Sequence, residues 1–135
     1  MLSLVQRVAL LAALSFMTLG QVYAHACGPQ GTIKIQKKDC FSAMNRLPGT
    51  NGQISSKSNP LTAIYRTCKL VLSTEDPKQV IRATKAAIKD GINSDIDSCH
   101  GYTSVNLQDD KYPDLAVRMY VGAYNSDPSD ETYTG

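Results

Sequence analysis

Four cysteines constrain the fold of this chain more than any other feature. They are Cys27, Cys40, Cys68 and Cys99, and all of them follow an apolar segment near the start of the chain. An even number of cysteines in a small exported chain indicates disulfides, here two. No two of them have the C-x-x-C spacing of a structural zinc site or a redox motif. The cysteines therefore predict a small domain that crosslinks hold together, provided that the chain leaves the cytosol.

The first 24 residues have the build of a secretory signal peptide. A positive charge at Arg7 is followed by an apolar run over residues 8–14 and then by small residues up to Ala24. The run is shorter than the roughly 20 residues that cross a bilayer. Cleavage after Ala24 is favoured, and cleavage after Ala26 remains open. The sequence thus predicts a secreted, extracellular protein without a transmembrane segment.

Charge and residue types exclude some functions. Lys and Arg number 14 and Asp and Glu number 12, a formal net charge of +2, so the balance favours neither a nucleic-acid binder nor a trap for acidic substrates. The only glutamates are Glu75 and Glu131, no G-x-S-x-G motif occurs, and the pair Asp97 and His100 lacks a nucleophile. We therefore expect a protein that is not an enzyme.

Periodicity along the chain predicts alternating strands and helices. Alternation of polar and apolar residues indicates strands, and apolar residues three and four apart indicate helices. Asp39 is a candidate N-cap for the first helix, and Asp76 followed by Pro77 for the second. The expected strands are 32–36, 53–55, 61–72, 102–107 and 116–124, and the expected helices are 39–47 and 76–91.

This order predicts an α+β fold, a two-layer sandwich of the split β-α-β, ferredoxin-like kind. Two helices then cover one face of a mainly antiparallel sheet. We expect one disulfide-stapled domain over residues 25–124, after a signal peptide at 1–24. Residues 125–135 carry three acids and no base, which predicts a disordered acidic tail.

The predicted topology chooses among the three possible cysteine pairings. In a split β-α-β fold the first and fourth strands are parallel neighbours, so Cys27 and Cys99 lie at the same end of the sheet. Cys40 on the buried side of the first helix and Cys68 in the third strand meet at the opposite end. We therefore predict the disulfides Cys27–Cys99 and Cys40–Cys68.

The surroundings of the cysteines carry a family resemblance. Ala26-Cys27-Gly28 stands before a strand, Asp39-Cys40 opens a helix, and Cys99-His100-Gly101 follows a helix. With Thr67-Cys68 inside a strand, the pattern resembles the small cysteine-rich secreted proteins of fungi that are related to killer toxins and necrosis-inducing effectors. The resemblance implies an antiparallel sheet covered by two helices, and a toxin or effector that acts on a membrane component or a host protein. It implies no active residues.

Two histidines suggest a metal site. The predicted bridge Cys27–Cys99 brings His25 close to His100, and cleavage after Ala24 makes His25 the N-terminal residue. A terminal amine and two imidazoles are the nitrogen donors of a copper brace. The alternative interpretation is a frayed terminus next to an unrelated surface histidine.

Two sets of side chains are candidates for surface binding. Four cations fall at helical spacing on the predicted second helix, where they form a basic stripe that suits phosphate or anionic lipid. Four tyrosines gather in the C-terminal strands, and exposed tyrosines contact sugars and proteins well. The first set also fits a solvated helix face and the second fits packing. The residues are Lys78, Arg82, Lys85 and Lys89, and Tyr102, Tyr112, Tyr120 and Tyr124.

The leading hypothesis from the sequence is a secreted interaction protein, toxin-like or effector-like, that binds a host or competitor target through its surface. Its partner would be a protein, a membrane component or a cell-wall component, and not a nucleic acid. One alternative is a copper-binding protein that uses His25 and His100. Another is a small secreted inhibitor or carbohydrate binder, which requires the exposed tyrosines to form one continuous patch.

Overall fold

The computed structural model describes residues 27–128. The predicted signal peptide at 1–24, His25 and residues 129–135 of the predicted tail lie outside this range. Helix α2 covers Lys37–Met44 and helix α3 covers Lys85–Cys99. The strands are β1 (Gly49–Thr50), β2 (Gln53–Ser56), β3 (Leu61–Tyr65), β4 (Cys68–Ser73), β5 (Ile81–Thr84), β6 (Thr103–Asn106) and β7 (Arg118–Ala123).

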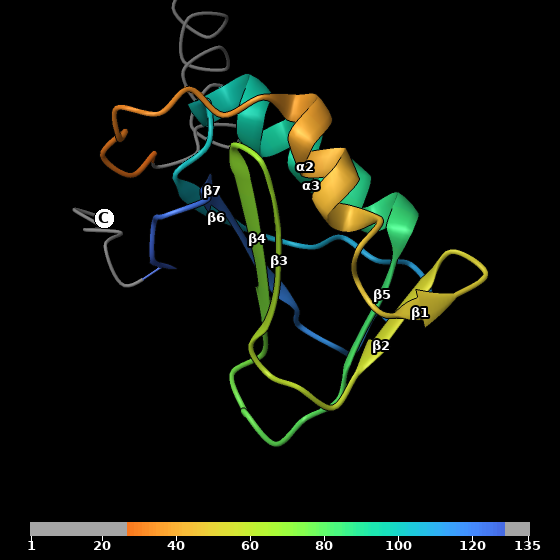
Figure 1. The fold of residues 1–135 in the computed structure, drawn as a ribbon. Helices are drawn as coiled ribbons and strands as arrows, with labels where there is room; N and C mark the ends of the chain where they lie inside the picture. The colour runs from red at the N-terminus through yellow and green to blue at the C-terminus, as the bar shows by residue number, and fades with distance from the viewer. Residues whose placement is uncertain (1–26, 129–135) are drawn as a thin grey trace, which may run out of the picture.

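The strands form two antiparallel sheets. One has the order β1-β2-β5 and the other has the order β3-β4-β7-β6. Both helices pack on one face of the four-stranded sheet, α2 against β3 and β4 and α3 against β6 and β7 (Figure 1). The predicted α+β class, with two helices over an antiparallel sheet in a two-layer sandwich, is confirmed.

The order of the strands differs from the ferredoxin-like prediction at the start of the domain. Residues 32–36 form no strand, so the described sheets contain no central parallel strand. Ile35 is buried in the core, and Ile33 packs against it, which accounts for the alternating pattern without strand pairing. The Gln36 N–H donates to the hydroxyl of Thr67 at 3.0 Å. The Ile33 carbonyl accepts from the Tyr102 hydroxyl at 2.8 Å, so two backbone groups of this segment bond to side chains instead of to a neighbouring strand.

The predicted single strand over residues 61–72 is a hairpin of β3 and β4. Leu61 and Ala63 are buried in β3, whereas Cys68, Leu70 and Leu72 are buried in β4. These core-facing residues have odd numbers in β3 and even numbers in β4. The change arises because a two-residue turn at 66–67 pairs residue 65 with residue 68. Neither residue of that turn is glycine, asparagine or proline, so the usual sequence signal of a turn is missing.

The predicted second helix at 76–91 is also different. It begins at Lys85, where the side chain of Thr84 accepts a hydrogen bond from the Ala87 N–H at 3.2 Å. Asp76 instead accepts from the Lys78 N–H and stabilises a turn, and the residues after it form β5. The helix continues past Gly91 to Cys99, because apolar residues keep recurring on its buried face.

One core joins the two sheets and the helices. Fully burying an aliphatic side chain stabilises a fold by about 1.5–3 kcal/mol, so a core of this kind supplies the main favourable free energy. It takes side chains from both sheets, which ties the three-stranded sheet to the rest of the domain. Its largest fully buried apolar members include Ile54, Leu70, Leu72, Ile81, Ile88, Ile92, Met119 and Val121.

Both predicted disulfides are confirmed. The Cα atoms of Cys27 and Cys99 lie 5.3 Å apart and those of Cys40 and Cys68 lie 5.1 Å apart. The pairing is as predicted, although the strand order used to predict it differs. The expected placement of the two bridges at opposite ends of the sheet is wrong: β4 and β6 both begin beside the end of β7, and both bridges lie at that end. Cys40 still lies on the buried face of α2, and Cys68 opens β4 directly after the hairpin turn.

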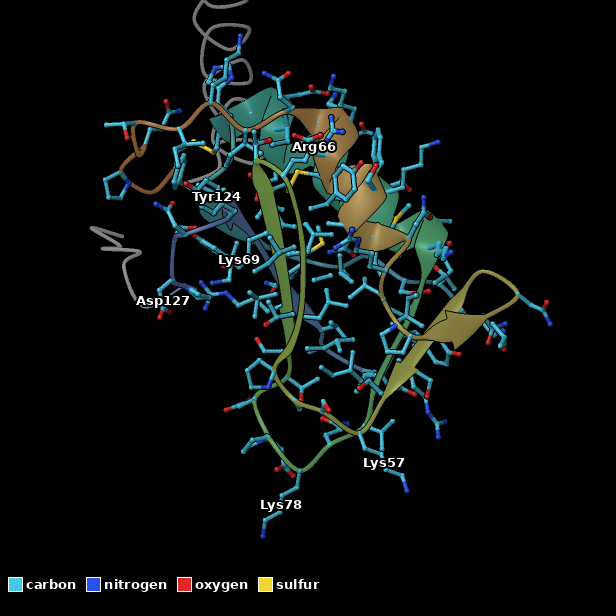
Figure 2. The ribbon with its side chains drawn as sticks, viewed as in Figure 1. Lys57, Arg66, Lys69, Lys78, Tyr124 and Asp127 are labelled. Carbon is cyan, nitrogen blue, oxygen red and sulfur yellow. A yellow bond between two sulfur atoms is a disulfide. The ribbon has the colours of Figure 1, made fainter. Side chains whose placement is uncertain are left out.

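The first residues of the predicted tail pack against the sheet. Ser126 donates to the Ala123 carbonyl, and its hydroxyl accepts from Tyr120 at 2.9 Å. The Lys69 ammonium reaches the Ser126 carbonyl at 2.7 Å. Lys69 and Asp127 lie on the same side of the molecule in Figure 2. In residues 27–128, no helix is both long and apolar enough to cross a membrane.

Candidate binding site

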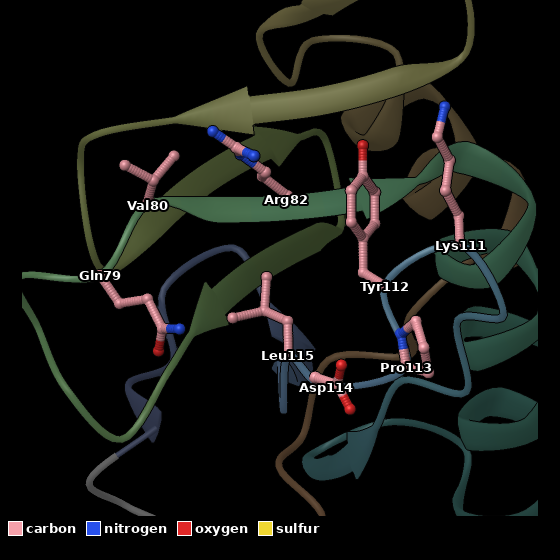
Figure 3. A pocket seen from close by; sticks show the side chains of 8 residues that line it. All are labelled: Gln79, Val80, Arg82, Lys111, Tyr112, Pro113, Asp114 and Leu115. Carbon is pink, nitrogen blue, oxygen red and sulfur yellow. The ribbon is translucent and has the colours of Figure 1, made fainter.

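A pocket of about 440 Å³ lies between β5 and the loop that joins β6 to β7. It combines two cations, one carboxylate, one aromatic ring and an apolar floor. Figure 3 shows these side chains, which come from two segments far apart in the sequence. The lining residues are Gln79, Val80, Arg82, Lys111, Tyr112, Pro113, Asp114 and Leu115.

Strand β5 directs Arg82 to the pocket. Successive side chains of a strand point to opposite faces, and Ile81 and Ala83 are fully buried in the core. Arg82 therefore projects to the solvent side, where it is exposed. Its backbone is paired with Ser55 of β2, so the base of the side chain is fixed by the three-stranded sheet.

Hydrogen bonds hold the opposite wall, residues 108–115, in place. The Thr84 N–H and hydroxyl donate to Oδ2 of Asp109 at 2.7 and 3.3 Å. The Tyr112 N–H donates to the Asp109 carbonyl, and the Leu115 N–H donates to the Tyr112 carbonyl. The Tyr112 hydroxyl reaches Oε1 of Gln53 at 3.2 Å. The loop is thus anchored to both β2 and the start of α3. Because the loop is already ordered, less conformational entropy is lost when a ligand binds.

The pocket cations have no ion-pair partner in the described part of the chain. An ion pair within residues 27–128 joins Lys37 to Asp97, on the two helices. Arg82 and Lys111 have no such partner in that range, although the carboxylate of Asp114 lies on the same lining. A guanidinium has five donors in a planar fork that matches carboxylate and phosphate oxygens. The pocket therefore offers charge and donors to an anionic group.

The remaining lining residues suit a flat or apolar moiety. In the view of Figure 3 the ring of Tyr112 stands between Arg82 and Lys111, and the Lys111 ammonium lies 5.9 Å from the ring centroid. Val80, to the left of Arg82 in Figure 3, and Leu115, below it, supply aliphatic surface. A site with a few polar groups over an apolar floor is the usual form of a ligand pocket.

The predicted basic stripe does not form. Lys78 lies in the turn that Asp76 stabilises, and Arg82 lies on β5. Only Lys85 and Lys89 are on α3, at a spacing of four residues. The helical spacing of the four cations is accidental, because the segment that contains the first two is not helical. The stripe prediction is therefore wrong, although Arg82 enters the pocket.

The four candidate tyrosines do not form one patch. Tyr112 lines the pocket, whereas Tyr102 donates its hydroxyl to the Ile33 carbonyl at 2.8 Å and is half-buried. Tyr120 is 4% exposed and packs on the four-stranded sheet, and Tyr124 is 48% exposed. Two of the four thus serve packing, and the continuous patch required for a tyrosine-based carbohydrate binder is absent from the described residues.

Of the two histidines of the predicted copper site, His25 lies outside the described residues and His100 lies within them. His100 is exposed and follows α3 with a left-handed backbone, φ 57°, and its N–H donates to the carbonyl of Ile96. Cys99 next to it is bonded to Cys27. Within residues 27–128 no cluster of three or more His, Cys, Asp or Glu side chains could hold a metal ion.

A buried carboxylate connects α2 to the β3–β4 turn. Asp39, 3% exposed, lies in the first turn of α2, and Gln36 occupies the N-cap position that the sequence predicts for Asp39. Oδ2 of Asp39 accepts from the Thr67 hydroxyl at 2.6 Å and from its N–H at 3.3 Å. The hydroxyl bond lowers the pKa of Asp39; the Thr67 N–H and the charges of Lys38 and Arg66 act in the same direction, whereas burial opposes them.

Sequence reasoning missed several lining residues, among them Lys111, Asp114 and Leu115. The available signal was the polar, turn-rich run at 108–113 between two strands, because loops held by a rigid scaffold often carry function. The sequence predicts a turn in this run and makes Tyr112 within it a candidate. What the sequence does not show is that this loop folds against β5.

No protein-family model matches this chain, and no curated protein matches it in sequence. The function is therefore argued from the pocket and its surroundings.

Proposed function

We propose that this is a secreted binding protein, effector-like or toxin-like, which recognises its target by accommodating a negatively charged group of that target in the pocket between β5 and residues 108–115. The ligand carries a carboxylate, phosphate or sulfate attached to a flat or apolar moiety. The two disulfides support export, because such bonds persist in oxidising compartments.

One observation carries the proposal: Arg82 and Tyr112, candidates in the sequence for unrelated reasons, line the same pocket together with Lys111. Neither cation is ion-paired in the described part of the chain. An exposed cation beside an aromatic ring is a common recognition element, since the ring supplies contact area and the cation supplies orientation. The loop is anchored before a ligand binds, and this favours affinity because less conformational entropy is lost on binding.

The proposed role is binding and not catalysis. The pocket lining contains one carboxylate, Asp114, and no histidine, cysteine, serine or threonine. Arg82, Lys111 and Tyr112 are residue types that supply contacts to a bound anion, and the proposal therefore assigns the pocket a binding role.

The proposal is tested with the oxidised mature protein against immobilised acidic peptides, oligosaccharides with uronic acid, phosphorylated glycans and neutral glucan and chitin oligomers. We expect anionic members to bind, and Arg82→Ala or Lys111→Ala to weaken that binding about tenfold, as loss of a good charged contact does. Lys57→Ala, an exposed cation outside the pocket, is the matched control and should bind like the parent protein.

The proposed biological role has a separate assay. The same variants are applied to cells in growth and necrosis assays, where the parent protein should be active and the pocket variants weak. Binding of the anionic members that is unchanged in an Arg82→Ala, Lys111→Ala double variant would refute the pocket as the site. Inactivity of the parent protein on every cell type and membrane preparation would count against the toxin or effector role.

A copper-binding protein is the second candidate function. The confirmed bridge Cys27–Cys99 favours it, because His25 is two residues before one cysteine and His100 directly follows the other. Mass spectrometry of the secreted protein gives the first test, since a mature chain that starts at Cys27 has no His25. The second test is a Cu(II) titration followed by electron paramagnetic resonance, in which His100→Ala should abolish a nitrogen-coordinated spectrum.

A further inference from the structure

Strand β5 is the last strand of its sheet, and the pocket lies along its outer edge. The sheet has the order β1-β2-β5, so β5 is paired with β2 on one side only within the described structure. The residues that line the pocket belong to the segments 79–82 and 111–115, and none of the described lining belongs to β2. In the view of Figure 3, β2 runs above β5, whereas Leu115 lies below β5. The edge of β5 opposite to β2 therefore faces the pocket.

The hydrogen bonds of the sheet show which residues of β5 direct their backbone groups to that edge. In an antiparallel pair, every second residue exchanges hydrogen bonds with the partner strand, and the residues between them direct the same groups away from it. Directly after β5, the Lys85 N–H donates to the Gly52 carbonyl at 2.8 Å. The residues of β5 that bond to β2 therefore have odd numbers. Arg82 and Thr84 direct their N–H and carbonyl groups away from β2.

Two further hydrogen bonds confirm this alternation. The Thr84 N–H donates to Oδ2 of Asp109 in the loop at 2.7 Å, so that a carboxylate takes the place of a neighbouring strand's carbonyl. The Ser55 N–H, opposite Arg82 in the register, donates to the Pro48 carbonyl at 3.2 Å, on the side of β1. The backbone of Arg82 thus presents a donor and an acceptor to the pocket. Within residues 27–128, no backbone hydrogen bond joins either group to the loop.

An extended peptide fits this edge. A strand edge is a template for a further strand, and an added residue accepts from the N–H and donates to the carbonyl of the residue opposite to it. Each residue of an extended peptide carries both groups at the spacing of a sheet. In an antiparallel arrangement, the side chain opposite Arg82 lies on the same face as the guanidinium. An acidic residue there forms a cross-strand pair of opposite charge.

We infer that the ligand of the pocket is an extended acidic peptide, which adds a strand to the sheet β1-β2-β5 by pairing with the backbone of Arg82. The inference rests on the proposed function, because the acidic side chain of the peptide is the anionic group that the pocket accommodates. It narrows the ligand to a segment of a partner protein. Main-chain hydrogen bonds supply affinity for any extended segment, whereas the cations Arg82 and Lys111 select an acidic one.

The test is a scan of N-methyl groups along a fluorescent peptide in which threonine and valine alternate and one central threonine is replaced by glutamate. Fluorescence anisotropy measures the affinity of each peptide for the oxidised mature protein. An N-methyl group on the residue that donates to the Arg82 carbonyl should weaken binding about tenfold, because it removes the donor. The residues on either side direct their N–H groups away from β5. Their N-methylated peptides are the matched controls and should bind like the parent peptide.

Amide hydrogen exchange gives a second readout, which requires no variant. The Arg82 N–H should exchange fast in the free protein and slowly in the complex with the peptide. The Ala83 N–H, which bonds to β2, should exchange slowly in both states and is the internal control. An oligosaccharide of uronic acids has carboxylates and no peptide groups. It should bind more weakly than the peptide and leave the Arg82 N–H unprotected.

Several outcomes would overturn the inference while the proposed function stands. They are equal effects of all N-methyl groups, an Arg82 N–H that stays unprotected in the complex, and a uronic acid oligosaccharide that binds more tightly than the peptide and competes with it. In each case, weaker binding of a peptide with glutamine in place of glutamate would still support an anion site. Binding that changes neither with this glutamine peptide nor with Arg82→Ala would refute the proposed function, and the inference with it.

Discussion

The two ends of the domain are held together by different means. The stapled end contains both disulfides and joins the start of α2, the end of α3 and the β3–β4 turn. Hydrogen bonds from Thr67 to Asp39 and the ion pair Lys37–Asp97 reinforce it. The pocket end consists of β2, β5 and residues 108–115. Strands β2 and β5 are at the lower right in Figure 1, and neither disulfide involves a residue of this end.

The pocket end depends on burial and hydrogen bonds alone. Ile54 and Ile81 fix its sheet to the core, and Asp109 fixes its loop to Thr84. Disulfides act mainly on the unfolded chain, whereas these contacts act locally. The difference indicates that the crosslinks stabilise the fold at one end while the other end accommodates a ligand. Four perturbations test this separation of stability and binding, in order of expected effect.

Removing a disulfide should have the largest effect on stability. The chain-entropy relation gives about 4.4 kcal/mol for Cys27–Cys99, which spans 72 residues, and about 3.6 kcal/mol for Cys40–Cys68, which spans 28. Paired Cys→Ser variants, compared by denaturant unfolding, give the measurement. We expect the pocket affinity of the folded fraction to stay unchanged. A variant that folds but loses pocket binding would show that the disulfides also maintain the pocket.

Shortening a core side chain at the pocket end should come second. Ile81→Ala removes a fully buried side chain of β5 and should cost about 3 kcal/mol of unfolding free energy. Hydrogen exchange should show earlier opening of β2 and β5 than of β4. The matched variant is Leu70→Ala in β4, near the disulfide, where local opening should be smaller. Equal local opening in both variants would show that the two ends of the domain do not differ in local stability.

Detaching the pocket loop should have a smaller effect on stability and a larger one on binding. Asp109→Ala leaves the Thr84 N–H without its acceptor, which should cost about 1–2 kcal/mol. Pocket affinity should also fall, because the loop loses its anchor. Asp110→Ala changes the exposed neighbouring acid and should leave both quantities at parental values. If Asp109→Ala alters neither, the loop is held by other contacts.

The smallest expected effect is a pH dependence at the stapled end. The pKa of Asp39 is lower in the folded protein than in the unfolded chain, because the carboxylate accepts the hydroxyl of Thr67. Its contribution to stability is therefore complete above about pH 4 and is lost as pH falls through the lower folded pKa. Thermal melts of Asp39→Asn across acidic pH should show a shallower decline than the parent protein. An identical decline would mean that Asp39 does not contribute to the acid sensitivity of the fold.

Several features of the fold could be predicted because they depend on local chemistry. The α+β class, the presence of two disulfides, a helix expected at 39–47 and observed at Lys37–Met44, and strands near residues 53–55 and 116–124 follow from cysteine count and periodicity. The cysteine pairing was instead chosen from a strand order that the structure does not have. The limits of the second helix could not be predicted well. Asp76-Pro77 and Thr84 are both adequate start signals, and only the pairing of β5 with β2 excludes the first.

The candidate site could be predicted only in fragments. Arg82 and Tyr112 are separated by 29 intervening positions, and each belongs to a sequence pattern that the structure does not contain, a basic helix stripe and a tyrosine patch. Their partner Lys111 has no distinguishing local pattern. The hairpin turn at Arg66 could not be predicted either, since an arginine at positive φ gives no sequence signal.

The sequence by itself determined the number of crosslinks, the positions at which apolar side chains recur and the class of fold. These properties follow from the residue types and from spacings of two to four residues. Tertiary structure alone decided where β5 begins, how residues 108–115 fold against it and which cations face a common space. Such contacts join segments far apart in the chain, and the free energy that selects them comes from the packing of the whole core.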